Sequence, residues 1–79
     1  MRDVKILGTG CPKCRKLEER MIVAADELSL DCEIEKVEDI EKIMSYGVMM
    51  TPALVIDGQI KTTGKVPAVE ELKSLLTEN

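Results

Sequence analysis

The sequence predicts a small α/β domain whose elements follow the order strand, helix, strand, helix, strand, strand, helix. Short apolar runs alternate with helical stripes of apolar residues, an Asp57-Gly58 turn joins the last two strands, and proline stands where the first and last helices begin. The alternation favours a parallel first pair of strands, and the Asp-Gly turn favours an antiparallel hairpin after it. A chain of 79 residues leaves room for a single domain, residues 1–79.

A glycine-rich loop joins the first strand to the first helix. Val4–Leu7 is a short apolar run followed by the Gly-Thr-Gly segment 8–10, which is typical of a strand that ends in a turn. Pro12 suits the first helical position, where its missing N–H costs nothing, and Cys11 then precedes the helix. We expect this helix over about Pro12–Leu28, because steps of three and four residues align its apolar positions. These positions are Cys14, Leu17, Met21, Ala24 and Leu28.

A second strand and a short helix are expected next. Asp31–Val37 alternates polar and apolar residues at first, which predicts a half-buried strand with Cys32 and Ile34 facing inward. The short helix that follows ends near Gly47, and we expect Met44 in the core. Its apolar positions are Ile40, Ile43 and Met44.

The last third of the chain contains the hairpin and the final helix. Ala53–Ile56 is a continuous apolar strand, and Gln59–Thr62 returns as its partner with Ile60 facing inward. Pro67 is expected to start the last helix. The apolar face of that helix consists of Val69, Leu72, Leu75 and Leu76.

Composition excludes several classes of function. Apolar residues make up 44% and charged residues 33%, which indicates a globular chain rather than a disordered one. Histidine is absent, so a Cys–His nucleophile, a Ser–His–Asp triad and an imidazole zinc site are excluded. A net charge of −4 with Tyr46 as the only aromatic residue argues against nucleic-acid binding. No apolar stretch resembles a membrane span or a secretory signal, so we expect a cytoplasmic protein.

The Cys11-Pro12-Lys13-Cys14 motif carries the strongest chemical signal. Helix-terminal N–H groups and the helix dipole favour the thiolate of Cys11, and Lys13 adds positive charge beside it. The spacing brings Cys14 within one helical turn of Cys11. By itself such a pair fits a redox couple, half of a metal site, or two unrelated buried thiols.

A redox role would give the two thiols different tasks. Cys14 starts the buried stripe of the helix, so Cys11 is expected to be the more accessible sulfur. On this hypothesis Cys11 attacks a substrate disulfide, and Cys14 then attacks the mixed disulfide and releases the reduced substrate. Pro12 and Lys13 would support the pair by starting the helix and by favouring the thiolate.

A second motif, Thr51-Pro52, stands directly before the strand Ala53–Ile56. Only about 5–6% of X–Pro bonds in folded proteins are cis, so this bond alone favours an ordinary trans proline at the start of a strand. The position of the motif relative to the cysteine pair argues for a different interpretation, which depends on a family resemblance.

The chain resembles the small thioredoxin-like and glutaredoxin-like proteins, and more narrowly the minimal redox-active disulfide proteins of archaea and bacteria. Three motifs carry the resemblance: the Cys-Pro-Lys-Cys pair after the first strand, Thr51-Pro52 before the third, and the Asp-Gly turn of the last hairpin. The resemblance implies a thioredoxin fold with a four-stranded mixed sheet in the order 2-1-3-4, flanked by three helices. It also implies a cis Pro52 packed against the two cysteines, and a Thr51 backbone that pairs with an extended substrate segment.

The same resemblance implies a thiol–disulfide oxidoreductase that reduces protein disulfides. Its electrons would come from an upstream reductase, and it would need no bound cofactor and no metal; we expect it to act as a monomer. The chain departs from larger thioredoxins at two positions, with Gly10 where they usually carry Trp and Lys5 where they usually carry a buried Asp. The glutathione-binding Gly-Gly-acidic segment of glutaredoxins is not reproduced around Gly64, which favours protein substrates.

The main alternative is a copper-type carrier that holds a soft monovalent metal between the two thiolates. The segment Gly8–Cys14 superficially resembles the GMTCxxC loop of copper chaperone domains. That fold places a hairpin directly after its first helix, whereas a single strand follows here, and Thr51-Pro52 has no role in a carrier. A third interpretation is an adaptor with an inert pair. Cys32 is expected to be a core thiol rather than a third ligand.

Overall fold

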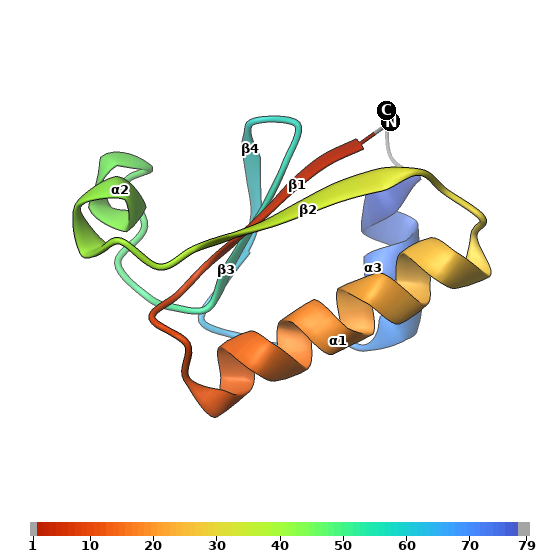
Figure 1. Ribbon diagram of the computed structural model, residues 1–79, viewed down its shortest axis with the longest axis horizontal. Coiled ribbons are helices and arrows are strands. Elements are labelled where there is room, and N and C mark those ends of the chain that lie inside the picture. The colour runs from red at the N-terminus through yellow and green to blue at the C-terminus, as the bar shows by residue number, and fades with distance from the viewer. Residues whose placement is uncertain (1, 78–79) are drawn as a thin grey trace.

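The computed structural model describes residues 2–77, and within them the elements follow the expected order (Figure 1). The strands are β1 (Arg2–Leu7), β2 (Cys32–Val37), β3 (Ala53–Ile56) and β4 (Gln59–Thr63). The helices are α1 (Pro12–Glu27), α2 (Ile40–Ser45) and α3 (Val69–Leu76). No helix in this part of the chain has both the length and the apolar character that crossing a bilayer requires.

The strands form one mixed sheet in the order β2-β1-β3-β4, which confirms the order that the resemblance implied. β1 pairs with β2 in parallel and with β3 in antiparallel orientation, and β3 pairs with β4 in antiparallel orientation. The parallel pair needs a helical crossover, which α1 provides. The antiparallel pair β3–β4 is closed by the predicted tight turn, in which Asp57 and Gly58 both have positive φ, 50° and 82°.

Helices cover the two faces of the sheet unequally. α1 and α3 lie side by side on one face, whereas α2 lies at one end of the sheet, away from them (Figure 1). The larger apolar cluster, under α1 and α3, contains Val4, Ile6, Leu17, Met21, Ala24, Ala25, Leu54, Ile56, Leu72 and Leu76. The smaller cluster, under α2, contains Leu7, Val37, Ile43, Val48, Ala53 and Val55. Because successive strand residues point to opposite faces, β1 and β3 contribute to both clusters, and β3 is therefore apolar throughout.

α1 starts where the sequence predicts and ends one residue earlier. Pro12 is the first helical residue, Cys11 is the N-cap, and Leu28 caps the C-terminal end. The expected stripe is buried from Cys14 to Ala24, and Leu28 packs partly buried against the larger cluster. The apolar spacing therefore holds α1 against the sheet and fixes the orientation of its N-terminal turn.

The expectation that Ile60 faces inward is wrong, because its side chain is 44% exposed. A β-bulge shifts the register between β3 and β4, so that Ile60 pairs with Val55 and Thr62 pairs with Leu54. Thr62 consequently lies on the well-covered face and is buried. Ile60 lies on the edge strand, on the face that only the short α2 covers, and stays in solvent.

Two expectations about the shorter helices are also wrong. Met44 is 68% exposed, because a helix of six residues presents only Ile43 to the core. Pro67 does not start the last helix, which has Ala68 as its N-cap and begins at Val69. The Pro67 carbonyl instead accepts a hydrogen bond from the Arg20 side chain at 3.2 Å, so Pro67 belongs to the segment that leads into the helix.

Candidate active site

Two loops that are distant in sequence meet at one end of the sheet. Leu7, the last residue of β1, pairs with Ala53, the first residue of β3. The loop after β1 therefore runs beside Pro52, and a methyl group added at Gly8 would come within 3.9 Å of Pro52 Cα. The structure thus brings the cysteine pair and the Thr51-Pro52 motif to the same edge of the sheet.

Cys11 and Cys14 are reduced and in direct contact, with their sulfur atoms 2.9 Å apart. Cys11 is the N-cap of α1 in an extended conformation, and this residue is partly exposed. Cys14 lies one turn further along the helix and is only 5% exposed. The pair consequently has one outer and one inner thiol, as the position of Cys14 in the apolar stripe predicts.

The pKa of the Cys11 thiol is lowered from its usual value. The largest cause is a hydrogen bond from the Cys14 thiol, followed by one from the backbone N–H of Cys14. Backbone N–H groups of Lys13 and of Cys11 itself contribute in the same direction. These donors belong to the first turn of α1, where no carbonyl of the helix can accept them. The helix terminus therefore favours the Cys11 thiolate, in agreement with the sequence argument.

The pKa of the Cys14 thiol is raised, first because burial disfavours its charged form and next because its proton is donated to Cys11. Its position depends on Gly8, which is itself buried. A methyl group at Gly8 would stand 2.1 Å from Cys14 Sγ, closer than any real contact. The absence of a side chain at Gly8 leaves the space that the inner sulfur occupies.

The Thr51–Pro52 peptide bond is cis, as the resemblance implied. Pro52 is fully buried, and its carbonyl accepts a hydrogen bond from the Gly64 N–H at 2.8 Å. Thr51 is exposed. The two residues before it, Met49 and Met50, are 98% and 62% exposed, and they add exposed apolar surface directly before the Thr51-Pro52 motif.

The remaining predicted residues lie where the sequence suggests. Pro12 and Lys13 occupy the exposed first turn of α1, directly between the two thiols in sequence. Cys32 is the first residue of β2, and the other end of this strand lies at the cysteine pair, so Cys32 is distant from the pair. Its side chain is half-buried and packs against the larger cluster. Burial raises the pKa of the Cys32 thiol, which suits a core residue.

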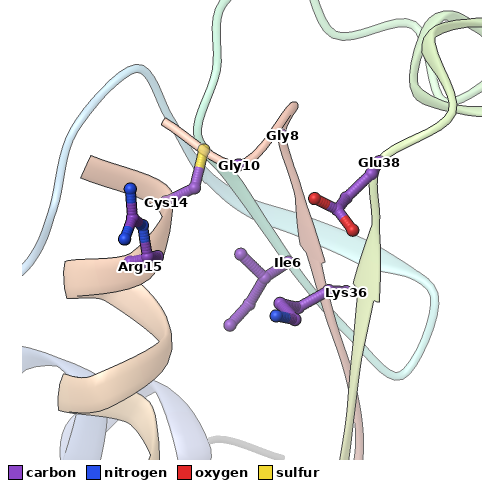
Figure 2. Close-up of a pocket in the computed structure, with 7 residues that line it drawn as sticks. All are labelled: Ile6, Gly8, Gly10, Cys14, Arg15, Lys36 and Glu38. Atoms are coloured by element: carbon purple, nitrogen blue, oxygen red, sulfur yellow. The ribbon is translucent and has the colours of Figure 1, made fainter. Parts of the chain in front are cut away.

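A small pocket beside Cys14 contains residues that the sequence analysis did not single out. Figure 2 shows Cys14 and Arg15 of α1 on one side, with Lys36 and Glu38 of the β2 segment facing them. The complete lining is Ile6, Gly8, Gly10, Cys14, Arg15, Lys36 and Glu38. The parallel pairing of β1 and β2 is the signal that could have indicated this, because the C-terminal ends of parallel neighbours lie at one edge.

A Cys-x-x-Cys pair at a strand-to-helix junction, beside a cis-proline on a sheet of this order, defines the thioredoxin class of thiol–disulfide oxidoreductases. Residues 2–77 match the family described as Thioredoxin domain. The chain belongs to this family and is a protein disulfide oxidoreductase. Such proteins act on protein substrates and exchange electrons with a reductase.

Archaeal thioredoxins are similar to almost the whole chain. A thioredoxin of Methanothermobacter thermautotrophicus is 38% identical over 77 residues, which cover 98% of this chain and 100% of the relative. A thioredoxin of Methanocaldococcus jannaschii is 44% identical over 73 residues, which cover 92% of this chain and 84% of the relative. These similarities, together with the late position of the hairpin, leave the soft-metal carrier without support.

Proposed function

We propose that this protein reduces protein disulfides by the successive action of Cys11 and Cys14. The Cys11 thiolate attacks one sulfur of the substrate disulfide, and the other substrate sulfur leaves as a thiolate. Cys14 then loses its proton and attacks the Cys11 sulfur, which releases the second substrate thiol and leaves a Cys11–Cys14 disulfide. The substrate gains two electrons, and the pair loses two.

The unequal environments of the two sulfur atoms support this assignment. Cys11 is the more accessible sulfur and has the lowered pKa, so it supplies the thiolate that starts exchange. Cys14 is buried with a raised pKa, which keeps it protonated until a mixed disulfide has formed at Cys11. Their contact at 2.9 Å means that ring closure needs little movement of the helix.

Thr51 and Pro52 are proposed to hold the substrate beside the pair. Thr51 is exposed two residues before β3, where its backbone suits pairing with an extended segment of the substrate. Pro52 is buried beneath it and fixes the course of the loop. Met49 and Met50 offer flexible apolar side chains that adapt to different substrates.

The oxidised pair must be reduced again before a further cycle. We propose that an upstream reductase protein supplies these electrons, that the chain works as a monomer in the cytoplasm without a bound cofactor, and that Pro12 and Lys13 support the thiolate. A cytosolic reductant of this class is expected to have a potential near −270 mV, about that of thioredoxin.

Trapping of a mixed disulfide tests the roles of the two cysteines. Cys14→Ser should accumulate a covalent complex with a disulfide-containing protein such as insulin, because no thiol remains to resolve it. Cys11→Ser should form none, and Cys32→Ser, the matched control, should turn over like the unaltered protein. Accumulation with Cys11→Ser instead would reverse the assignment, and loss of turnover with Cys32→Ser would show that the pair does not act alone.

A further inference from the structure

The pocket beside Cys14 is large enough for one water molecule, and the Glu38 carboxylate belongs to its lining. Its volume is about 20 Å³, and a cavity that holds a single water needs roughly 10–15 Å³. Cys14 lines it from α1, and the Glu38 side chain points into it from the segment after β2 (Figure 2). An inner thiol and a carboxylate therefore share one small space.

Gly10 lies next to both the Cys14 thiol and the Glu38 carboxylate. Its backbone lies within hydrogen-bonding reach of the Cys14 sulfur and favours the thiolate there. A methyl group added at Gly10 would stand 3.0 Å from Glu38 Oε2, so the carboxylate lies against the face of Gly10 that has no side chain. Gly10 also has φ of +87°, a conformation that few other residues adopt. The sequence at this position thus leaves room for Glu38 beside Cys14.

The second step of the proposed reaction needs a proton acceptor at this place. Burial raises the pKa of the Cys14 thiol, and only its thiolate attacks the mixed disulfide. Lys5 stands where larger thioredoxins usually carry a buried Asp, and its ammonium is hydrogen-bonded to Asp3 at 2.9 Å. Lys5 therefore provides no carboxylate for Cys14.

We propose that Glu38 accepts the proton of Cys14 through one water molecule in this pocket. The inference rests on the proposed function of the pair. As Cys14 Sγ bonds to the Cys11 sulfur, its proton passes to the water, the water gives a proton to the Glu38 carboxylate, and the substrate sulfur leaves with the electron pair of the broken bond. Glu38 is exposed on its other side, so it can return the proton to solvent.

The pocket is lined by charged groups of both signs. Besides Glu38, Arg15 of α1 and Lys36 of β2 line it, and the Lys36 ammonium lies 3.7 Å from the Glu18 carboxylate. A negative charge held only for its field would disfavour a thiolate at Cys14, because like charges repel. Removal of that charge alone would therefore speed the second step, whereas removal of a proton acceptor slows it. The sign of the change separates the two roles.

Stopped-flow reaction with the coloured disulfide dithiobis(nitrobenzoate) resolves the two steps. In a Cys32→Ser background, attack by Cys11 releases one thionitrobenzoate, and attack by Cys14 on the mixed disulfide releases the second. In Glu38→Gln the first phase should keep its rate, and the second should slow by about 100-fold near neutral pH, the lower end of a general base's contribution. The deficit should close above the pKa of Cys14, where solvent removes the proton.

Two further variants complete the test. Glu33→Gln makes the same charge change on β2 at an exposed position outside the pocket, and both phases should match the parent. Glu38→Asp keeps a carboxylate and should recover part of the second rate. An unchanged or faster second phase in Glu38→Gln, with the first phase intact, would overturn the role of Glu38 alone. Absence of a second phase in the parent would instead overturn the proposed function.

Discussion

Replacement of Gly8 by alanine tests whether the space beside Gly8, which the Cys14 sulfur occupies, is needed for stability and for the lowered pKa of Cys11. The added methyl group would stand 2.1 Å from Cys14 Sγ, whereas unbonded heavy atoms meet at about 3.5–4.0 Å. The sulfur must therefore retreat by about 1.5 Å. Its contact with Cys11, now 2.9 Å between sulfur atoms, would not survive such a shift.

Two effects of known sign follow from this displacement. Overpacking a buried site typically costs about 1–3 kcal/mol of unfolding free energy. In a domain of this size each kcal/mol lowers Tm by about 4–8 °C. The pKa of Cys11 should rise toward its usual value of 9.0, because its largest stabilising contact is the hydrogen bond from Cys14.

Thermal unfolding of the reduced protein and ultraviolet titration of the thiolate measure these two effects. Gly8→Ala should cost much less stability when Cys14→Ala has already removed the sulfur, a coupling that a double-mutant cycle reports. Gly47→Ala is the matched control: its φ of +82° makes alanine unfavourable, but within residues 2–77 no atom beyond its two chain neighbours lies within 4 Å of the new methyl group. It should lower Tm and leave the Cys11 titration unchanged. An unaltered Tm and titration in Gly8→Ala would refute the role assigned to Gly8.

Three further outcomes are expected. In the reduced protein, thiolate absorbance should appear in separate steps, the Cys11 step below pH 9.0 and the Cys14 step above it; a single step at 9.0 would contradict the contact between the thiols. Leu72→Ala should lower the unfolding free energy in urea by about 2–5 kcal/mol, because Leu72 is fully buried between α3 and the sheet, whereas Ile22→Ala on the exposed face of α1 should cost far less. Asp57→Asn should destabilise the protein near neutral pH but not in strong acid. The pKa of Asp57 is lowered, first by the Asp3 backbone N–H and then by Arg2, so its contribution is complete above pH 3.8 and disappears as the pH falls through the folded-state value. Equal losses at both pH values would contradict this account.

Most of the fold could be predicted because its signals are local. The continuous apolar run of β3, the Asp-Gly turn and the stripe of α1 each depend on neighbouring residues, and each element lies within a residue or two of its expected bounds. The exposure of Ile60 could not be predicted, because a β-bulge sets the register of β4 and the sequence nearby contains no signal for that bulge. The prediction that Met44 lies in the core was wrong for a related reason. Helical spacing marks apolar positions, but it does not show how little of the sheet α2 covers.

The site divides in the same way. Cys11 and Cys14 were found because two residues between cysteines at a helix start constitute a chemical signal within a single segment. Gly8 and Glu38 come near Cys14 only in the folded chain. Gly8 leaves the space that the Cys14 sulfur occupies. Glu38 follows β2, the parallel neighbour of β1, and lines the same pocket as Cys14. Neither residue forms a pattern with the cysteines along the chain, so only the strand order reveals them.

Because the apolar interior is divided into a larger and a smaller cluster, the two parts of the molecule should differ in their free energy of local unfolding. The cysteine pair belongs to α1, which is anchored in the larger cluster, whereas the residues that lead to Thr51 follow α2, which buries only Ile43. Segments with few buried contacts open at lower free energy and exchange their amide hydrogens faster. The segment that contains Cys11 and Cys14 is therefore expected to be the more rigid part of the site. The part that meets the substrate can rearrange without disturbing the two sulfur atoms.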